Sequence, residues 1–138
     1  MDYYFDANEA LEKAKALIRI PGSGKQALLA SNRVILLNPN NIDAYTGKAW
    51  ILYCSQRNQE ALEACNTAIR IQPGCAKAYT LKGKLLDRER KDKESQLAFS
   101  NALKLDPHNP RIKIARFNAL RSKKKANASG NNIIQNES

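Results

Sequence analysis

The sequence predicts an all-α protein made of stacked helical hairpins, and three observations support this fold class. A short phrase ending in proline occurs three times, so that Pro39, Pro73 and Pro107 are equally spaced; we refer to their separation as the repeat period. Between these corners, apolar residues recur at the i, i+3, i+4, i+7 spacing of a helix. They also fall at the same offsets in successive periods. Because one hairpin cannot bury its own apolar face, a fixed period of this length indicates a stack of hairpins.

The first hairpin is predicted over residues 8–41, after a short lead-in segment at residues 1–7. Asp6 can cap its first helix, because a carboxylate there accepts hydrogen bonds from the free N–H groups of the first turn. That helix is expected over about residues 7–20 and the second over about residues 25–37. Between them, Pro21-Gly22-Ser23-Gly24 ends the helix, since glycine permits a left-handed turn and proline cannot continue the backbone hydrogen bonds.

The second and third hairpins are predicted over residues 42–75 and 76–109, with helices at about 42–54, 59–71, 76–87 and 92–105. When the periods are aligned, small residues recur where two helices must approach closely, and a larger residue recurs where the gap must be filled. The predicted core columns are Leu11, Tyr45 and Tyr79; Ala27, Ala61 and Ser95; Ser31, Cys65 and Phe99; and Val34, Ala68 and Ala102.

A seventh helix is predicted over residues 110–124, with Pro110 at its first position, where a missing N–H loses no helical hydrogen bond. We expect this helix to cover the end of the stack and to present a polar outer face, as terminal repeats require. The polar tail over residues 125–138 contains little that could be buried, and it is expected to be disordered.

The net charge of +10 lies almost entirely in the second half of the chain. Residues 1–76 contain eight Lys/Arg and seven Asp/Glu, a sum of +1, whereas residues 77–125 contain fifteen Lys/Arg and five Asp/Glu, a sum of +10. A basic half favours an acidic protein surface, an anionic peptide or a nucleic acid as a partner. Solubility is the alternative explanation of this charge, and it implies no partner.

No catalytic, metal-binding or cofactor-binding constellation is predicted, so the protein is not expected to be an enzyme. His108 lies in a proline-rich turn, and the three cysteines are widely separated, without the close pairs of a zinc site. Their odd number favours a reducing compartment, and neither a signal peptide nor a membrane span is expected. We therefore predict a cytoplasmic protein. Nuclear import is the alternative, suggested by Arg121, Lys123, Lys124 and Lys125.

These repeats resemble the tetratricopeptide repeat (TPR) family over about residues 7–121. The resemblance implies a right-handed α-solenoid of three TPR helix pairs with a seventh, capping helix. It also implies a concave face, lined by the first helix of each pair, that holds an extended peptide or a partner helix. Lys15 and Ser95 depart from the family pattern. The matching residues are Leu11, Ala27 and Pro39 in the first repeat, Tyr45, Ala49, Leu52, Ala61, Ala68 and Pro73 in the second, and Tyr79, Gly83, Leu86, Phe99, Ala102 and Pro107 in the third.

Helical phase predicts the residues of this groove, because they lie opposite the core stripe. Trp50 and Tyr53 are the most partner-like of them, since aromatic side chains dominate interface energetics. The alternative is that Trp50 packs against a neighbouring helix or the N-terminal segment. The predicted partner-binding groove comprises Asp43, Thr46, Trp50 and Tyr53 in the third helix and Lys77, Thr80, Lys84 and Arg88 in the fifth; in the first helix the same face carries Glu9, Glu12 and Ala16.

The predicted function is a protein-interaction adaptor or scaffold that binds a peptide or helix of a partner in this groove. Nucleic-acid or acidic-surface binding through the basic half is the alternative. Base stacking is not favoured, because Tyr79, Phe99 and Phe117 are all expected in the core. Self-association through the open N-terminal end, with Tyr3, Tyr4 and Phe5, is a third hypothesis.

One subset of the TPR family clamps the C-terminal carboxylate of chaperones with five cationic or amide side chains. The resemblance aligns Glu12, Ala16, Gly47, Lys77 and Leu81 with these positions. Only Lys77 fits, and Glu12 would repel a carboxylate where the clamp needs a cation. We therefore predict that this protein does not bind chaperone tails through the clamp.

Overall fold

The computed structural model describes residues 3–121, and it describes side chains from residue 9 onward. Over this range the chain is all-α, with no strand, so the predicted fold class is confirmed. Residues 110–121 are also helical, and we refer to them as the C-terminal helix. The preceding helices are α1 (Tyr3–Ile18), α2 (Gly24–Leu37), α3 (Ile42–Cys54), α4 (Asn58–Ile71), α5 (Ala76–Arg88) and α6 (Asp92–Leu105).

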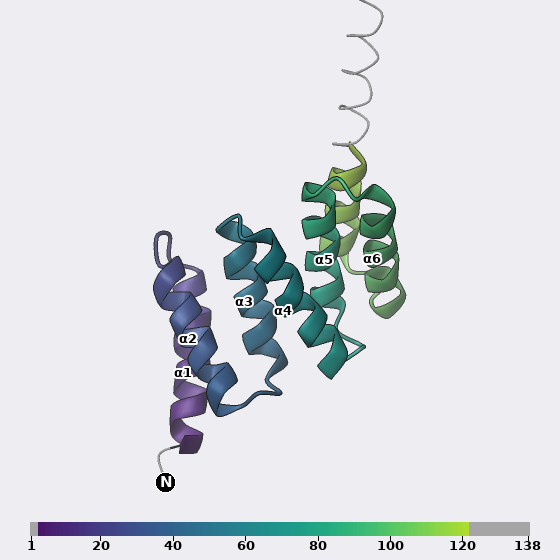
Figure 1. Ribbon diagram of the computed structural model, residues 1–138. Coiled ribbons are helices and arrows are strands. Elements are labelled where there is room, and N and C mark those ends of the chain that lie inside the picture. Colours follow the sequence, from purple (N-terminus) through teal and green to yellow (C-terminus); the bar gives the residue numbers. More distant parts are fainter. Residues whose placement is uncertain (1–2, 122–138) are drawn as a thin grey trace, which may run out of the picture.

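The helices form three hairpins that follow one another along the molecule, with the C-terminal helix beside α5 and α6 (Figure 1). Each helix packs mainly against its hairpin partner, and each hairpin packs against the next. The first helices of the hairpins also contact one another in sequence, α1 with α3 and α3 with α5. The side chains of α1, α3 and α5 can therefore form one continuous surface, as a solenoid requires.

The turn inside each hairpin contains a left-handed residue at the same position of the repeat period. Gly22, Gln56 and Arg90 are separated by one repeat period each, and all have positive φ, at 84°, 63° and 59°. In the second and third hairpins, the next residue donates its N–H to a carbonyl near the end of the preceding helix, from Arg57 to Leu52 and from Lys91 to Leu86, at 2.9 Å in both cases. This pattern satisfies carbonyls that the helix end would leave without a partner. The repeat period therefore extends to the backbone of the turns.

The second helix of each hairpin supplies the centre of the core. Every residue of its three predicted columns is at most 1% exposed, from Ala27 to Ala102. The column of Leu11, Tyr45 and Tyr79 is only half-buried. Burial also raises the pKa of the Cys65 thiol to about 12, which keeps it neutral and suits a small core residue.

The third hairpin accommodates Ser95, its one departure from the family pattern, beside a close contact between Gly83 and Phe99. A Cβ atom added to Gly83 would lie 2.8 Å from the ring of Phe99, so only glycine leaves space for this ring. Phe99 is fully buried there. The Ser95 hydroxyl, also buried, donates a hydrogen bond of 2.7 Å to the Gly83 carbonyl. A polar group in the core is therefore satisfied within the same hairpin.

Two expectations about the ends of the stack differ from the structure. Helix α1 begins at Tyr3 and not near Ala7, since neither glycine nor proline interrupts the chain before Pro21. The sequence predicts a polar outer face for the C-terminal helix and a core position for Phe117, but both expectations are wrong, because Ile114 and Phe117 are 59% and 63% exposed. A single helix buries one stripe against α6, and no second helix covers the other within residues 3–121. Residues 122–138, including Lys123, Lys124 and Lys125, lie outside the described range.

Candidate functional site

Four residues of the predicted groove meet between α3 and α5, and we refer to Trp50, Tyr53, Lys84 and Arg88 as the aromatic–cationic cluster. The rings of Trp50 and Tyr53 are stacked, with centroids 5.5 Å apart and planes inclined by 20°. The Lys84 Nζ lies 5.5 Å from the centre of the Trp50 ring. The Arg88 guanidinium carbon lies 3.8 Å from the centre of the Tyr53 ring. Each ring therefore carries a cation–π contact in addition to the stack.

The aromatic pair arises from the helical period of α3. Positions 50 and 53 have an i, i+3 relation, which places their side chains on one face one turn apart. Lys84 follows Trp50 by one repeat period, so it occupies the equivalent position of the next first helix. The sequence alone therefore accounts for the direction of these side chains, and the packing of α3 on α5 brings them together.

Arg88 connects the cluster to the end of α3 and to the start of α4. One guanidinium nitrogen donates to the Tyr53 carbonyl at 2.7 Å and to the Asn58 side-chain oxygen at 2.8 Å. The amide nitrogen of Asn58 in turn donates to a Glu89 carboxylate oxygen at 2.8 Å. These bonds fix the guanidinium over the Tyr53 ring. Arg88 is thus a positioning residue for the ring as well as a source of positive charge.

Two open hollows flank the aromatic pair. Trp50 lies at the edge of a hollow of 800 Å³, whose other lining residues come from the end of α1, the start of α2 and the end of α3. Tyr53 and Lys84 line a smaller hollow of 230 Å³, together with Asn118 of the C-terminal helix. Trp50 is 39% exposed. It is therefore available to solvent, while its stacking on Tyr53 limits its freedom.

The other four predicted groove residues do not join this cluster. The Asp43 carboxylate lies 3.9 Å from the Lys15 ammonium, which connects α3 to α1. The hydroxyls of Thr46 and Thr80 donate to carbonyls of their own helices, at 3.2 Å to Ile42 and at 2.8 Å to Ala76. The remaining residue, Lys77, lies on the first turn of α5 and is exposed.

Asp87 is a neighbour of the cluster that is not among the predicted groove residues. It is half-buried and lines the smaller hollow beside Lys84. Burial raises the pKa of its carboxyl group, and the nearby Asp92 carboxylate raises it further. Its i, i+3 relation to Lys84 is the signal that could have placed it on this face. Asp87 reduces the positive charge of the site.

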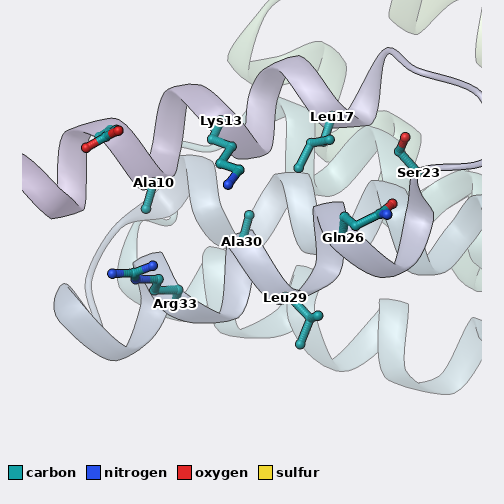
Figure 2. Close-up of a pocket in the computed structure, with 9 residues that line it drawn as sticks. Ala10, Lys13, Leu17, Ser23, Gln26, Leu29, Ala30 and Arg33 are labelled. Carbon is teal, nitrogen blue, oxygen red and sulfur yellow. The ribbon is translucent and has the colours of Figure 1, made fainter.

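A third hollow, of 640 Å³, lies between α1 and α2 at the open end of the stack. Figure 2 shows Lys13, Gln26 and Arg33 around it, with the later helices behind α1 and α2. Its lining mixes charged, polar and apolar side chains. The side chains of Tyr3, Tyr4 and Phe5 lie outside the described part, so self-association through this end is not tested.

The described residues can be searched for a metal site, for a membrane-spanning helix and for the state of the cysteines. Among residues 3–121, no three His, Cys, Asp or Glu side chains are grouped closely enough to hold a metal ion. In the same range, no helix is long and apolar enough to cross a membrane. The three cysteines are free thiols, with Cys54 exposed and the other two buried.

Comparison with known proteins identifies the fold. No family model matches the chain, and no curated protein matches its sequence. Among solved structures, the first TPR of Spaghetti (RPAP3) bound to the HSP90 peptide SRMEEVD is similar, with a TM-score of 0.78 and 19% identity over 86% of this chain and 94% of that one. The chain folds as a TPR domain. The predicted TPR solenoid is therefore confirmed.

Two further TPR domains have the same arrangement. The second TPR domain of human RPAP3, in complex with the HSP70 peptide SGPTIEEVD, has a TM-score of 0.76 and 20% identity over 85% of this chain and 97% of that one. The TPR domain of Arabidopsis OM64 has a TM-score of 0.71 and 28% identity over 84% of this chain and 98% of that one.

These structures correct one prediction about partners. Two TPR domains with this fold are complexed with chaperone peptides that end in EEVD. The prediction that chaperone tails are not bound is therefore contradicted. It depended on five aligned clamp positions alone, whereas the folded chain also presents cations elsewhere on α5, notably Lys84.

Proposed function

We propose that this TPR domain is a non-catalytic interaction module that binds an acidic peptide segment of a partner protein across α3 and α5. The single observation that carries this proposal is the aromatic–cationic cluster. It presents an exposed tryptophan stacked on Tyr53, with Lys84 and Arg88 held against the two rings. Aromatic and arginine side chains in a fixed arrangement are the residues that most often dominate interface energies.

The charge of α5 supports an acidic partner. Lys77, Lys84 and Arg88 lie on the groove side of this helix in the predicted phase, whereas Asp87 is the acidic residue beside them. The carboxylates of an acidic segment would gain favourable contacts with these cations. The peptide SRMEEVD, which is bound by the first TPR of Spaghetti, combines three acidic side chains with a methionine and is a suitable probe.

A protein partner is favoured over a nucleic acid by the state of the two rings. Base stacking needs an available aromatic face. The rings of Trp50 and Tyr53 are already stacked on each other, and each also has a cation against it. A base would have to displace one of these contacts. The free thiols also suit a reducing compartment such as the cytoplasm, which we propose as the location.

The proposal is tested by titrating the full chain with SRMEEVD and measuring binding by calorimetry. Trp50 is the only tryptophan, so its fluorescence reports independently whether the peptide reaches the cluster. We expect Lys84→Glu to weaken binding about tenfold or more, because it places a like charge beside the carboxylates. Lys104→Glu, which makes the same change in charge at an exposed position on α6, is the matched control and should alter affinity about twofold at most.

A second peptide tests whether binding depends on the negative charge of the acidic side chains or only on their shape. In this peptide, glutamine and asparagine replace the acidic side chains of SRMEEVD, and we expect it to bind more weakly than the original. Equal loss of affinity in Lys84→Glu and Lys104→Glu would mean that only net charge matters and would reject the proposed groove. Binding that leaves the Trp50 fluorescence unchanged and persists in Tyr53→Ala would reject it as well.

A further inference from the structure

The C-terminal helix presents an uncovered apolar stripe on a face separate from the aromatic–cationic cluster. The stripe consists of Ile114, Phe117 and Leu120, which are 59%, 63% and 43% exposed. The opposite side of the same helix is buried, where Ala115 packs against Phe99 of α6. Three large apolar side chains at helical spacing therefore face solvent, although isolated exposed apolar residues are normal on a protein surface.

The repeat period indicates what this face is shaped to receive. One period before Phe117, Gly83 of α5 is covered by the Phe99 ring of α6. Two periods before Leu120, Leu52 of α3 is buried in one cluster with residues of α4. In both earlier hairpins, the equivalent face of the first helix is therefore covered by a helix. Phe117 and Leu120 lie on this same face, and no second helix covers it within residues 3–121. Ile114 is one period after Thr80, so it extends the stripe toward the groove side.

The size of Phe117 restricts the residue that can face it. In the third hairpin, a glycine at this position faces a phenylalanine, and in the second hairpin Ala49 belongs to one buried cluster with the intermediate-sized Cys65. A small residue on one helix is thus matched by a larger one on the other, as close packing requires. Because Phe117 is already large, the covering helix needs alanine or glycine opposite it.

The chain's own later residues do not have this pattern. The buried positions of α6 recur one period later as Ser129, Asn132, Ile133 and Asn136. Three of these four are polar, and the apolar one, Ile133, stands where Phe117 leaves space only for a small side chain. The sequence therefore favours a covering helix from another protein.

The charges around the stripe indicate the chemistry of that partner. Residues 110–121 contain four cationic residues and no acidic residue. All four are exposed, and Arg116 contacts Gln96 of α6 at 3.3 Å, which leaves its charge uncompensated by that contact. A second copy of the chain would bring like charges together, which is unfavourable. Aspartate or glutamate beside an apolar face would complement them. The four cations are Arg111, Lys113, Arg116 and Arg121.

We infer that the apolar stripe docks an amphipathic helix of a partner protein, with a small residue opposite Phe117 and acidic residues flanking its apolar face. This inference does not depend on the proposed peptide groove, because it concerns the other side of the C-terminal helix. A helix laid into an apolar face and read by residues at i, i+3 and i+7 is a known mode of protein recognition.

The test uses a labelled, end-capped peptide of about 18 residues, long enough to form a helix. It carries leucines at helical spacing around a central alanine, with glutamates beside them; a matched peptide has lysines in place of the glutamates. Fluorescence anisotropy with the full chain should give binding of the glutamate peptide and about tenfold or greater weakening for the lysine peptide. Phe117→Ser should weaken binding about tenfold or more. Leu36→Ser changes an apolar residue that is 82% exposed on α2, and it should leave the affinity unchanged.

Four outcomes would overturn the inference. The first is no binding of the glutamate peptide, and the second is equal binding by Phe117→Ser. The third is that Phe117 serves another contact: either light scattering detects self-association that Phe117→Ser abolishes, or anionic vesicles bind the chain through Phe117 and the peptide does not compete. The fourth is a fall in Tm of more than about 5 °C on Phe117→Ser without peptide, since this would mean that the chain already covers the stripe itself.

Discussion

The first and third hairpins are built on the same period but are packed differently at equivalent positions. In the third hairpin, Gly83 leaves space that Phe99 fills completely, and the buried Ser95 hydroxyl is hydrogen-bonded. In the first hairpin, the position of Gly83 is occupied by Lys15, whose ammonium pairs with acids at the surface. The position of Phe99 is occupied by Ser31, whose buried hydroxyl has no hydrogen-bond partner in the described part of the chain.

This difference shows that repeats of one fold need not be stabilised equally. The backbone period is kept in both hairpins, including the left-handed residue in the turn. The third hairpin adds shape complementarity and a satisfied polar group, whereas the first contains a polar group that has lost water without gaining a partner. We therefore expect the third hairpin to contribute more to the stability of the solenoid. Three sets of substitutions test this comparison.

The largest expected effect is that of Phe99→Ala. It leaves a cavity between Gly83 and the C-terminal helix and should lower the free energy of unfolding by about 3 to 5 kcal/mol. Phe117→Ala is the matched control, because the same side chain is removed from an exposed position and should cost less than about 1 kcal/mol. Denaturant unfolding followed by circular dichroism measures both. Similar losses for the two variants would contradict the packing described for the third hairpin.

A smaller loss is expected for Gly83→Ala. The added methyl group would lie 2.8 Å from the Phe99 ring, and such overpacking costs about 1 to 3 kcal/mol, which exceeds the gain of about 1 kcal/mol in helix propensity. Gly24→Ala should be neutral or stabilising, since the nearest atom to its new methyl group is 3.9 Å away. Thermal unfolding distinguishes them. The double variant with Phe99→Leu should recover part of the loss, and failure to do so would argue against a steric cause.

The smallest expected change in the free energy of unfolding should have opposite signs in the two hairpins. Ser31→Ala removes a buried hydroxyl without a partner and should stabilise the protein by about 1 kcal/mol. Ser95→Ala removes a hydroxyl bonded to the Gly83 carbonyl and should destabilise it by about 1 kcal/mol. Chemical denaturation of the two variants provides the measurement. A loss of stability in both would show that Ser31 has a partner after all.

The periodicity of the sequence was enough to predict most of the fold. It identified the helices and the buried columns of α2, α4 and α6, because a helix that packs in the same way three times keeps the same positions in its core. It did not predict the exposed stripe at Phe117. A helical pattern gives the residues that share a face, but it does not tell whether a neighbour covers that face.

The candidate site, like the fold, could be predicted only in part from the sequence. Helical phase alone places Trp50 and Tyr53 on one face, and the repeat period alone relates Trp50 to Lys84. Only the packing of α3 on α5 decides that the cations lie against the rings and that Arg88 is bound to the Tyr53 carbonyl. Local spacing is fixed by the covalent chain and the geometry of one helix. Contacts between helices depend on the size and direction of side chains from two helices at once, so the tertiary structure decides them.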